Sequence, residues 1–451
     1  MKGKSFAVVF IIAVIASALA FGSAVPSAKA QEKPIVISYV CDISQEAGSV
    51  PASWMKLAAR QINDAGGISG RPLELSIQDC KGQTSLAVEA YVRALVNDKA
   101  NFVIIYGRSE IALACEAKAA EMFDEYPHIF IASNCGSNEI TDRIVDDYEK
   151  WKFVFRDNCA QLGRIKIYHQ PIEFFRKHLG LKKIALLRED LLWTQSFFKG
   201  VPATEKRGGI LGLPDYARSL GMEVVYEKAV KYKAGMYSPI LEAVAASGAE
   251  CCLFVAGPGT GMDDFVKQWV DSSARDMHMS ITSGPGANFW QITGGKALGV
   301  MFSGAGQVPL LRGKDTPEIP DVLDMAKKHN LTMASSVVLS AYPNMFFIKK
   351  VVEKAGGVKD IDALIKAMET TEIMGPLGLL RYEMTKIPPF FHQAVFLDPK
   401  NPSEYAVNGL QGDFGQFQED GNIVLLAKPY PGVDGSPNYY KSPAELRKMK
   451  K

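Results

Sequence analysis

Short polar turns follow several apolar segments of the chain, and their side chains could bind a small molecule. Residues 101–106 lead into Gly107, Arg108, Ser109 and Glu110, where a glycine turn meets the start of a helix. Main-chain N–H groups at such a point, with the Ser109 hydroxyl, suit a carboxylate or another anion. Arg108 could add a charge-assisted hydrogen bond. The alternative interpretation is an ordinary helix cap beside a solvated arginine.

Similar turns follow three later segments. Residues 128–132 precede a small polar turn that contains Asn134, Cys135 and Gly136. Trp193 comes shortly after residues 183–187 and fits either the core of a lobe or an aromatic wall of a cleft. The remaining candidates are glycine and proline residues of two further turns: Gly257, Pro258, Gly284 and Pro285. The first of these turns is a weak candidate for a phosphate loop, because it lacks the Lys-Ser/Thr of nucleotide-binding loops.

The chain lacks the residue patterns of common catalytic sites. It contains no G-x-S-x-G, no H-E-x-x-H and no ordered glycine fingerprint. Its 6 histidines are scattered and do not show the spacing of metal ligands. Cys135 is the one side chain that we would test as a nucleophile. We therefore expect no catalytic residues, no cofactor and no metal, and we expect that the protein is not an enzyme.

An alternation of strands and helices positions these turns. Strand-like segments occur at residues 34–40, 73–77, 101–106 and 128–132, and the pattern restarts at 183–187, 222–226, 251–256 and 277–282. Amphipathic stretches between them are typical of helices. Two successive blocks of this kind predict an α/β protein with two doubly wound parallel-sheet lobes. Ligands of such sheets bind at the carboxyl ends of the strands, where the polar turns lie.

The N-terminus has the pattern of an export signal. Lys2 and Lys4 precede the apolar residues 6–21, and small residues follow up to Ala30. We expect residues 1–30 to be a cleaved signal peptide and the protein to be periplasmic; the alternative is an N-terminal membrane anchor. The formal net charge is +2, without a basic stripe, so nucleic acid is not an expected partner.

Several segments together resemble one family, the type I periplasmic binding proteins of the leucine/isoleucine/valine class. The resemblance spans residues 34–397 and rests on the order and spacing of these segments: 59–73, 78–80, 95–98, 137–141 and 374–377. It implies the substrate-binding protein of an ABC uptake transporter. The partners would be a small-molecule ligand and an inner-membrane permease, and we expect a monomer.

The resemblance also implies how the chain divides. Three crossovers near residues 155, 305 and 380 would form the hinge, and closure of the lobes would enclose the ligand. Lobe 1 would comprise residues 31–155 and 306–378, and lobe 2 residues 156–305 and 379–398. We expect residues 399–451 to form an extension that wraps the surface.

The ligand residues implied by the resemblance include one important gap. Ser109 and the turn with Asn134, Cys135 and Gly136 occupy the places that hold an α-carboxylate, and Trp193 stands where relatives often have tyrosine. The acid that pairs with an ammonium in amino-acid binders is missing from the turn with Gly284 and Pro285. Two readings remain: Glu110, Glu46 or Asp190 replaces that acid, or the ligand has no α-ammonium, as in an aromatic acid.

Two further questions stay open at the level of sequence. Cys80 matches a position that some relatives use in a disulfide, with Cys41 or Cys115 as candidate partners, and Cys135 with Cys159 is another candidate pair. The same fold could also present its ligand to a receptor or regulator, which would make the protein a sensor.

Overall fold

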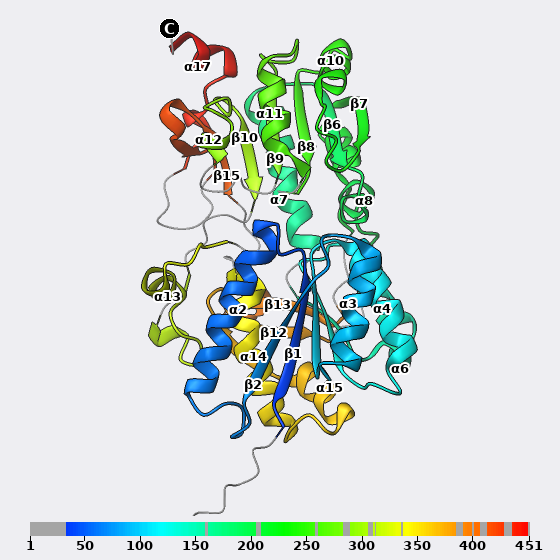
Figure 1. The fold of residues 1–451 in the computed structure, drawn as a ribbon. Coiled ribbons are helices and arrows are strands. Elements are labelled where there is room, and N and C mark those ends of the chain that lie inside the picture. The colour runs from blue at the N-terminus through cyan, green and yellow to red at the C-terminus, as the bar shows by residue number, and fades with distance from the viewer. Residues whose placement is uncertain are drawn as a thin grey trace, which may run out of the picture.

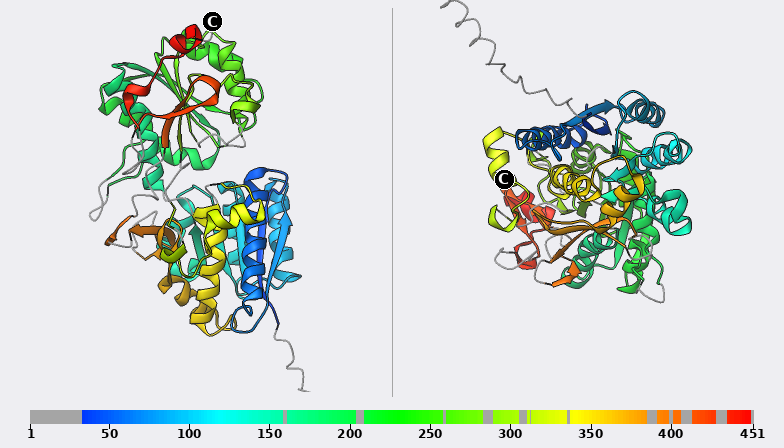
Figure 2. Two further views of the ribbon diagram at one scale, coloured as in Figure 1. Left: turned by 90° about the vertical axis from the view of Figure 1, so that its left-hand side faces the viewer. Right: turned by 90° about the horizontal axis from the view of Figure 1, so that it is seen from below.

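The computed structural model shows two α/β lobes, one above the other in Figure 1 and in the left view of Figure 2. It describes residues 33–157, 161–203, 209–257, 260–282, 289–304, 310–311, 313–334, 337–384, 391–398, 401–405, 413–427 and 435–449. Within these residues each lobe is built around one sheet. The prediction of two α/β lobes is confirmed.

The sheet of the lower lobe has 9 strands in the described part of the chain. Its parallel strands are β1 (Ile35–Cys41), β2 (Leu73–Asp79), β3 (Phe102–Tyr106), β4 (Ile129–Ser133) and β5 (Val154–Asp157). Every residue of β1, β3 and β4 is buried, because helices cover both faces of the sheet. Four strands with antiparallel pairing extend the sheet beyond β5: β11 (Glu372–Gly375), β12 (Gly378–Glu383), β13 (Gln393–Asp398) and β14 (Asn401–Tyr405).

Amphipathic helices pack on this first sheet. The helices of the lower lobe are α2 (Glu46–Asp64), α3 (Thr84–Val96), α4 (Ser109–Met122), α5 (Glu139–Asp146), α6 (Tyr148–Trp151), α13 (Val322–His329), α14 (Tyr342–Ala355) and α15 (Ile361–Thr370). In α2, Trp54, Leu57 and Ala58 are buried. The helix begins at Glu46 and includes Pro51.

The sheet of the upper lobe has 7 strands in the described part. Its parallel strands are β6 (Lys183–Glu189), β7 (Glu223–Val230), β8 (Cys251–Val255), β9 (His278–Thr282) and β10 (Met301–Gly304). The surrounding helices are α7 (Gln161–Glu173), α8 (Leu192–Lys199), α9 (Leu213–Ser219), α10 (Ser238–Ala246), α11 (Met262–Val270) and α12 (Phe289–Ile292). Separate apolar clusters fill the two faces of this sheet, one around Phe254 and Trp269 and one around Leu186 and Phe197.

The described strands show where the chain passes between the lobes. It leaves the first sheet after β5, returns to it after β10, and leaves it again between β14 and β15 (Asp413–Phe417). We expected residues 379–398 in lobe 2, and that assignment was wrong. Strand β13 pairs in parallel with β5 of the first sheet, and β12 pairs with both β11 and β13. The alternating burial of β12 fits an outer strand of either sheet, so the sequence pattern could not decide between the lobes.

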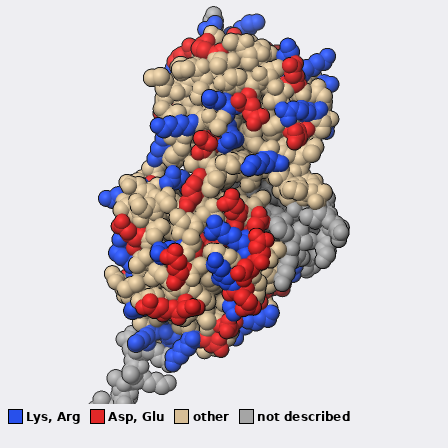
Figure 3. Space-filling view, turned by 90° about the vertical axis from the view of Figure 1, so that its right-hand side faces the viewer, with Lys and Arg blue, Asp and Glu red and all other residues tan. Residues whose placement is uncertain are grey.

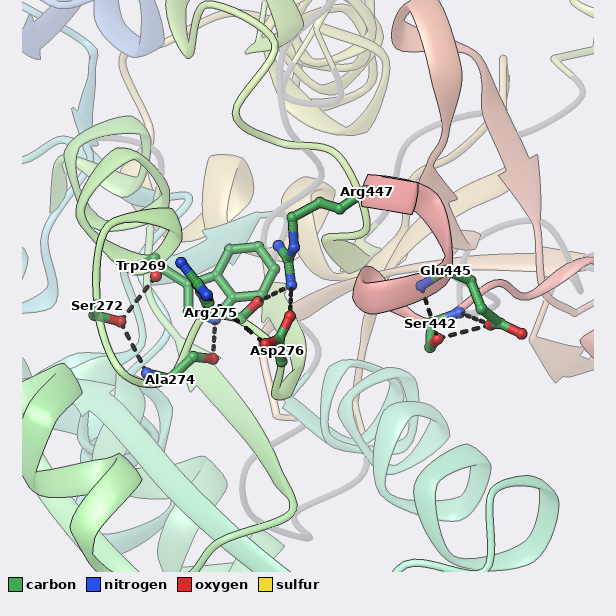
Figure 4. Close-up of polar contacts among 8 residues, drawn as sticks. All are labelled: Trp269, Ser272, Ala274, Arg275, Asp276, Ser442, Glu445 and Arg447. Atoms are coloured by element: carbon green, nitrogen blue, oxygen red, sulfur yellow. Dashed lines mark hydrogen bonds and ion pairs between the residues drawn. The ribbon is translucent and has the colours of Figure 1, made fainter. Parts of the chain in front are cut away.

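The C-terminal residues belong to the lobes and are not a separate wrapping. β14 joins the first sheet, while β15 pairs with β10 and with β16 (Ile423–Leu425) in the second. The final helix, α17 (Pro443–Met449), docks on the upper lobe. The Arg447 guanidinium lies over the Trp269 ring, 5.9 Å from the ring centroid (Figure 4). It donates a hydrogen bond to the Arg275 carbonyl at 2.6 Å and pairs with Asp276. The expected surface extension is therefore corrected: β14 belongs to lobe 1, whereas β15, β16 and α17 belong to lobe 2.

The surface mixes charges of both signs. On the face drawn in Figure 3, lysine and arginine side chains alternate with aspartate and glutamate over both lobes. That face offers no extended basic surface of the kind that binds nucleic acid. Among the described residues, no helix is long and apolar enough to cross a membrane.

Candidate functional site

The turn after β3 starts α4 and lies against the turn after β4. Gly107 has a φ of 119°, which favours glycine, and its N–H donates to the Ser133 carbonyl at 3.1 Å. Ser109, the first residue of α4, is fully buried, and its hydroxyl accepts a hydrogen bond from the Ser137 N–H at 2.9 Å. The structure therefore brings together the two turns in which we predicted carboxylate-binding residues.

The turn after β4 is held in an unusual backbone conformation. Asn134 adopts a left-handed φ of 56°, and its side-chain amide donates to the Tyr106 hydroxyl at 3.2 Å. The Cys135 thiol is buried and lies 3.2 Å from the Ser133 carbonyl and 3.4 Å from that of Gly107. Gly136 is also buried. This burial leaves the thiol badly placed for attack on an entering substrate, which argues against Cys135 as a nucleophile.

Asp157 accepts hydrogen bonds from the turn after β4. This residue was not identified from the sequence. It ends β5, is fully buried, and accepts a hydrogen bond from the Asn344 side chain at the start of α14. Burial raises the pKa of Asp157 to about 7, while hydrogen bonds from Ser133, the Asn134 main chain and Asn344 oppose the rise. The short segment before it, residues 153–156, gave no strand signal that would have placed an acid here.

Glu189, another acid that the sequence analysis missed, holds a group of neighbouring residues of the upper lobe together. It ends β6, is 1% exposed, and accepts hydrogen bonds from the Trp193 indole, the Thr260 hydroxyl and the Gly257 main chain. Burial raises the pKa of Glu189, and these three hydrogen bonds oppose that rise. We call Glu189, Trp193, Gly257 and Thr260 the Glu189 cluster.

Gly257 lies directly against the other members of this cluster. A Cβ atom there would lie 3.4 Å from Glu189 Oε1 and 3.8 Å from Trp193 Cζ2. Trp193 is half-buried and also packs edge-on against Phe197, at 5.5 Å between ring centroids. The indole of Trp193 thus packs against Phe197 and donates its N–H to Glu189, and the two contacts together fix the orientation of the ring.

The first turn of α4, in the lower lobe, contacts the upper lobe. Glu110 Oε1 accepts a hydrogen bond from the Leu192 N–H of α8 at 2.8 Å. The Arg108 guanidinium lies 5.6 Å from the centre of the Tyr232 ring, which belongs to the loop after β7. Burial raises the pKa of Tyr232; the charge of Arg108 opposes the rise, and Glu189 adds to it. Arg108 and Glu110, which we predicted to bind ligand, therefore both contact the opposite lobe.

The other predicted acids are poorly placed for a buried ammonium. Glu46 is exposed at the start of α2, and the side chain of Asp190 is 61% exposed and pairs with Arg188 at 3.5 Å. Glu110 Oε2 is buried and has no hydrogen-bond partner among the described residues. Pro258, Gly284 and Pro285 lie outside the described residues.

The cysteine pairs suggested by the resemblance are corrected where the structure describes them. Cys41, Cys80 and Cys115 are buried, free thiols. Burial raises the pKa of Cys115 to about 12, and it raises the pKa of Cys41 and of Cys80 as well. Cys159, the candidate partner of Cys135, lies outside the described residues. No group of three or more His, Cys, Asp or Glu side chains in the described ranges could hold a metal ion.

Several solved structures share this architecture. An amino acid ABC transporter substrate-binding protein from Pseudomonas fluorescens Pf-5 is 17% identical, with a TM-score of 0.62 over 88% of this chain and 97% of that one. A solute-binding protein of an ABC transporter from Rhodopseudomonas palustris, solved with 4-hydroxybenzoate, is 16% identical, with a TM-score of 0.63 over 86% and 95%. A third, from Rhodopseudomonas palustris BisB5 with 3,4-dihydroxybenzoic acid, is 18% identical, with a TM-score of 0.61 over 90% and 99%. At these identities the likeness shows the fold alone.

Two α/β lobes, crossed repeatedly by the chain and contacting each other through polar turns, define a two-lobed ligand-binding protein. Residues 34–386 match the family model described as periplasmic binding protein, and the chain belongs to that family. The resemblance found in the sequence is thereby confirmed. None of the curated proteins matches the chain.

Proposed function

We propose that the protein is the periplasmic substrate-binding component of an ABC uptake transporter, and that it delivers a small carboxylate ligand to an inner-membrane permease. The observation that carries this proposal is that the polar turns of the two lobes lie against each other, where Glu110 of one lobe accepts a hydrogen bond from the Leu192 N–H of the other. A small molecule held between such turns is enclosed when the lobes approach each other.

The ligand class that the site supports best is an aromatic carboxylate. The upper lobe offers the flat indole of Trp193, fixed by Glu189. The lower lobe offers the main-chain turns around Ser109 and Asn134. Two proteins of similar fold were solved with hydroxylated benzoates, which is consistent with this choice.

An α-amino acid is the second candidate, and one observation favours it. A buried ammonium needs a carboxylate partner. Glu189 already accepts three hydrogen bonds, and Glu46 and Asp190 are exposed. Glu110 Oε2 is the remaining acceptor with no hydrogen-bond partner among the described residues of this site. An amino-acid ligand would therefore have to reach Glu110.

A thermal-shift screen of the protein without its first 30 residues tests the proposal. The compounds are 4-hydroxybenzoate, benzoate, leucine and valine. A ligand at a hundredfold excess over its Kd stabilises the folded state by about 2.7 kcal/mol. We expect the aromatic acids to raise the melting temperature and the amino acids to leave it unchanged. A response to leucine or valine alone would replace the aromatic proposal with the amino-acid alternative.

Two other functions, a sensor and an enzyme, can be distinguished from transport by different assays. A sensor would bind the same ligand, but deleting the gene would then abolish a transcriptional or motile response and leave uptake of the ligand intact. An enzyme would consume its ligand, so chromatography of the ligand after incubation with the protein would show a product. We expect loss of uptake on deletion and complete recovery of unchanged ligand.

A further inference from the structure

The first turn of α4 contacts the upper lobe at two points. Glu110 Oε1 lies 2.8 Å from the N–H of Leu192, the first residue of α8. Leu192 itself is half-buried against the apolar core of the lower lobe. Arg108, two residues before Glu110, places its guanidinium over the Tyr232 ring. Both contacts join residues that belong to different lobes.

The carboxylate of Glu110 supplies what α8 lacks. The first N–H groups of a helix have no partner within the helix, and a negative charge near them is stabilising. The residue before α8 is Leu191, which has no side-chain oxygen and makes no capping hydrogen bond. Glu110 therefore caps α8 from the opposite lobe.

Arg108 makes one contact within the lower lobe and a second contact with the upper lobe. The guanidinium donates to the Gly82 carbonyl within the lower lobe, which holds the side chain in place. The Tyr232 ring then approaches it from the upper lobe at 5.6 Å, a distance typical of a cation–π contact. Opening the lobes would break this contact and leave the bond to Gly82 intact.

We propose that Arg108, Glu110, Leu192 and Tyr232 form an interlobe clasp, which strengthens ligand binding by stabilising the approach of the lobes without contacting the ligand. The inference rests on the proposed function, because it assumes that the lobes bind a ligand between them. It assigns Arg108 and Glu110 a positioning role in place of the ligand contact that their sequence positions suggested.

A clasp and a ligand contact leave different signatures. The apparent Kd of a ligand rises by the factor by which the binding-competent arrangement becomes rarer. Loss of the clasp must then weaken every ligand by the same factor. Loss of a direct contact weakens most strongly those ligands that carry the contacted group.

The first experiment measures the lobe arrangement in the protein without added ligand. Spin labels are attached at exposed Lys56 of α2 and Lys228 of β7, and their distance distribution is recorded by electron resonance. Glu110→Ala and Tyr232→Leu are expected to shift the distribution to longer distances. Tyr232→Phe keeps the ring and is expected to match the wild type. The control Glu121→Gln lies on the same helix, where Glu121 pairs with Lys118.

The second experiment titrates the same variants with each compound that stabilises the wild type. We expect Glu110→Ala to weaken all of them by about tenfold, the loss of one charge-assisted hydrogen bond. Glu110→Gln keeps a carbonyl acceptor for the Leu192 N–H and should recover part of the affinity. Unchanged distances in Glu110→Ala and Tyr232→Leu would overturn the clasp, and so would losses that differ strongly between ligands. The distance measurement needs no ligand, so it tests the clasp even if the wild type binds none of the compounds.

Discussion

Replacing Glu189 with alanine should destabilise the upper lobe and weaken ligand binding. The substitution removes the acceptor of three donors: the buried Thr260 hydroxyl and two groups of half-buried residues, the Trp193 indole and the Gly257 main chain. A buried donor left without a partner costs about 1–3 kcal/mol. The Thr260 hydroxyl can rotate toward another acceptor, and removal of a buried carboxyl relieves its desolvation. The two remaining donors belong to half-buried residues, so each costs about the lower end of that range, and we expect a loss of about 2 kcal/mol in the free energy of unfolding.

The assay is urea unfolding followed by circular dichroism, together with calorimetric titration of the ligand. Because Glu189 fixes the Trp193 ring, we expect the ligand Kd to rise about tenfold, a change of about 1.4 kcal/mol. Glu223→Ala is the matched control, since Glu223 is an exposed acid at the start of β7 in the same lobe. The reasoning is refuted if Glu189→Ala unfolds within about 0.5 kcal/mol of the wild type, as surface substitutions usually do, and retains the wild-type Kd.

Three further outcomes follow from other parts of the structure. Asn134→Ala should cost about 1–2 kcal/mol because Asn134 has a φ of 56°, whereas Asn134→Gly should retain most of the stability; urea unfolding compares the two. The pKa of Asp157 is raised from 3.8 to about 7, so its stabilisation is complete below pH 3.8 and is lost as the pH rises through 7. Unfolding free energies measured from pH 4 to pH 8 should therefore fall less steeply in Asp157→Asn than in the wild type. Arg447→Ala should lower the unfolding free energy by about 1 kcal/mol by releasing α17 from Asp276 at a partly exposed ion pair, whereas Lys448→Ala, beside it on α17, should not.

The architecture could be read from the sequence because its main signals are local. Continuous apolar segments such as residues 101–106 became buried strands, and the glycines after Asp64 ended α2. The late strands could not be assigned in the same way. β13 joins β5 across more than 200 residues, through the pairing of Gln393 with Arg156, and no local pattern encodes that choice of sheet.

The candidate site was predicted in part. The sequence located the turns after β3, β4 and β6, because ligand sites lie where parallel strands end. It missed Glu189 and Asp157, whose importance comes from burial and from donors supplied by distant segments. The sequence also predicted that Arg108 and Glu110 bind the ligand. Nothing in the sequence shows that Tyr232 and Leu192 of the other lobe lie beside them.

The central claim is that the two lobes bind one small aromatic carboxylate between them. Isothermal titration of the protein with 4-hydroxybenzoate, with leucine as the comparison, tests it most directly. We predict one-to-one binding of 4-hydroxybenzoate that Trp193→Ala weakens, and no heat of binding with leucine. Binding of leucine without any response to 4-hydroxybenzoate would contradict the claim.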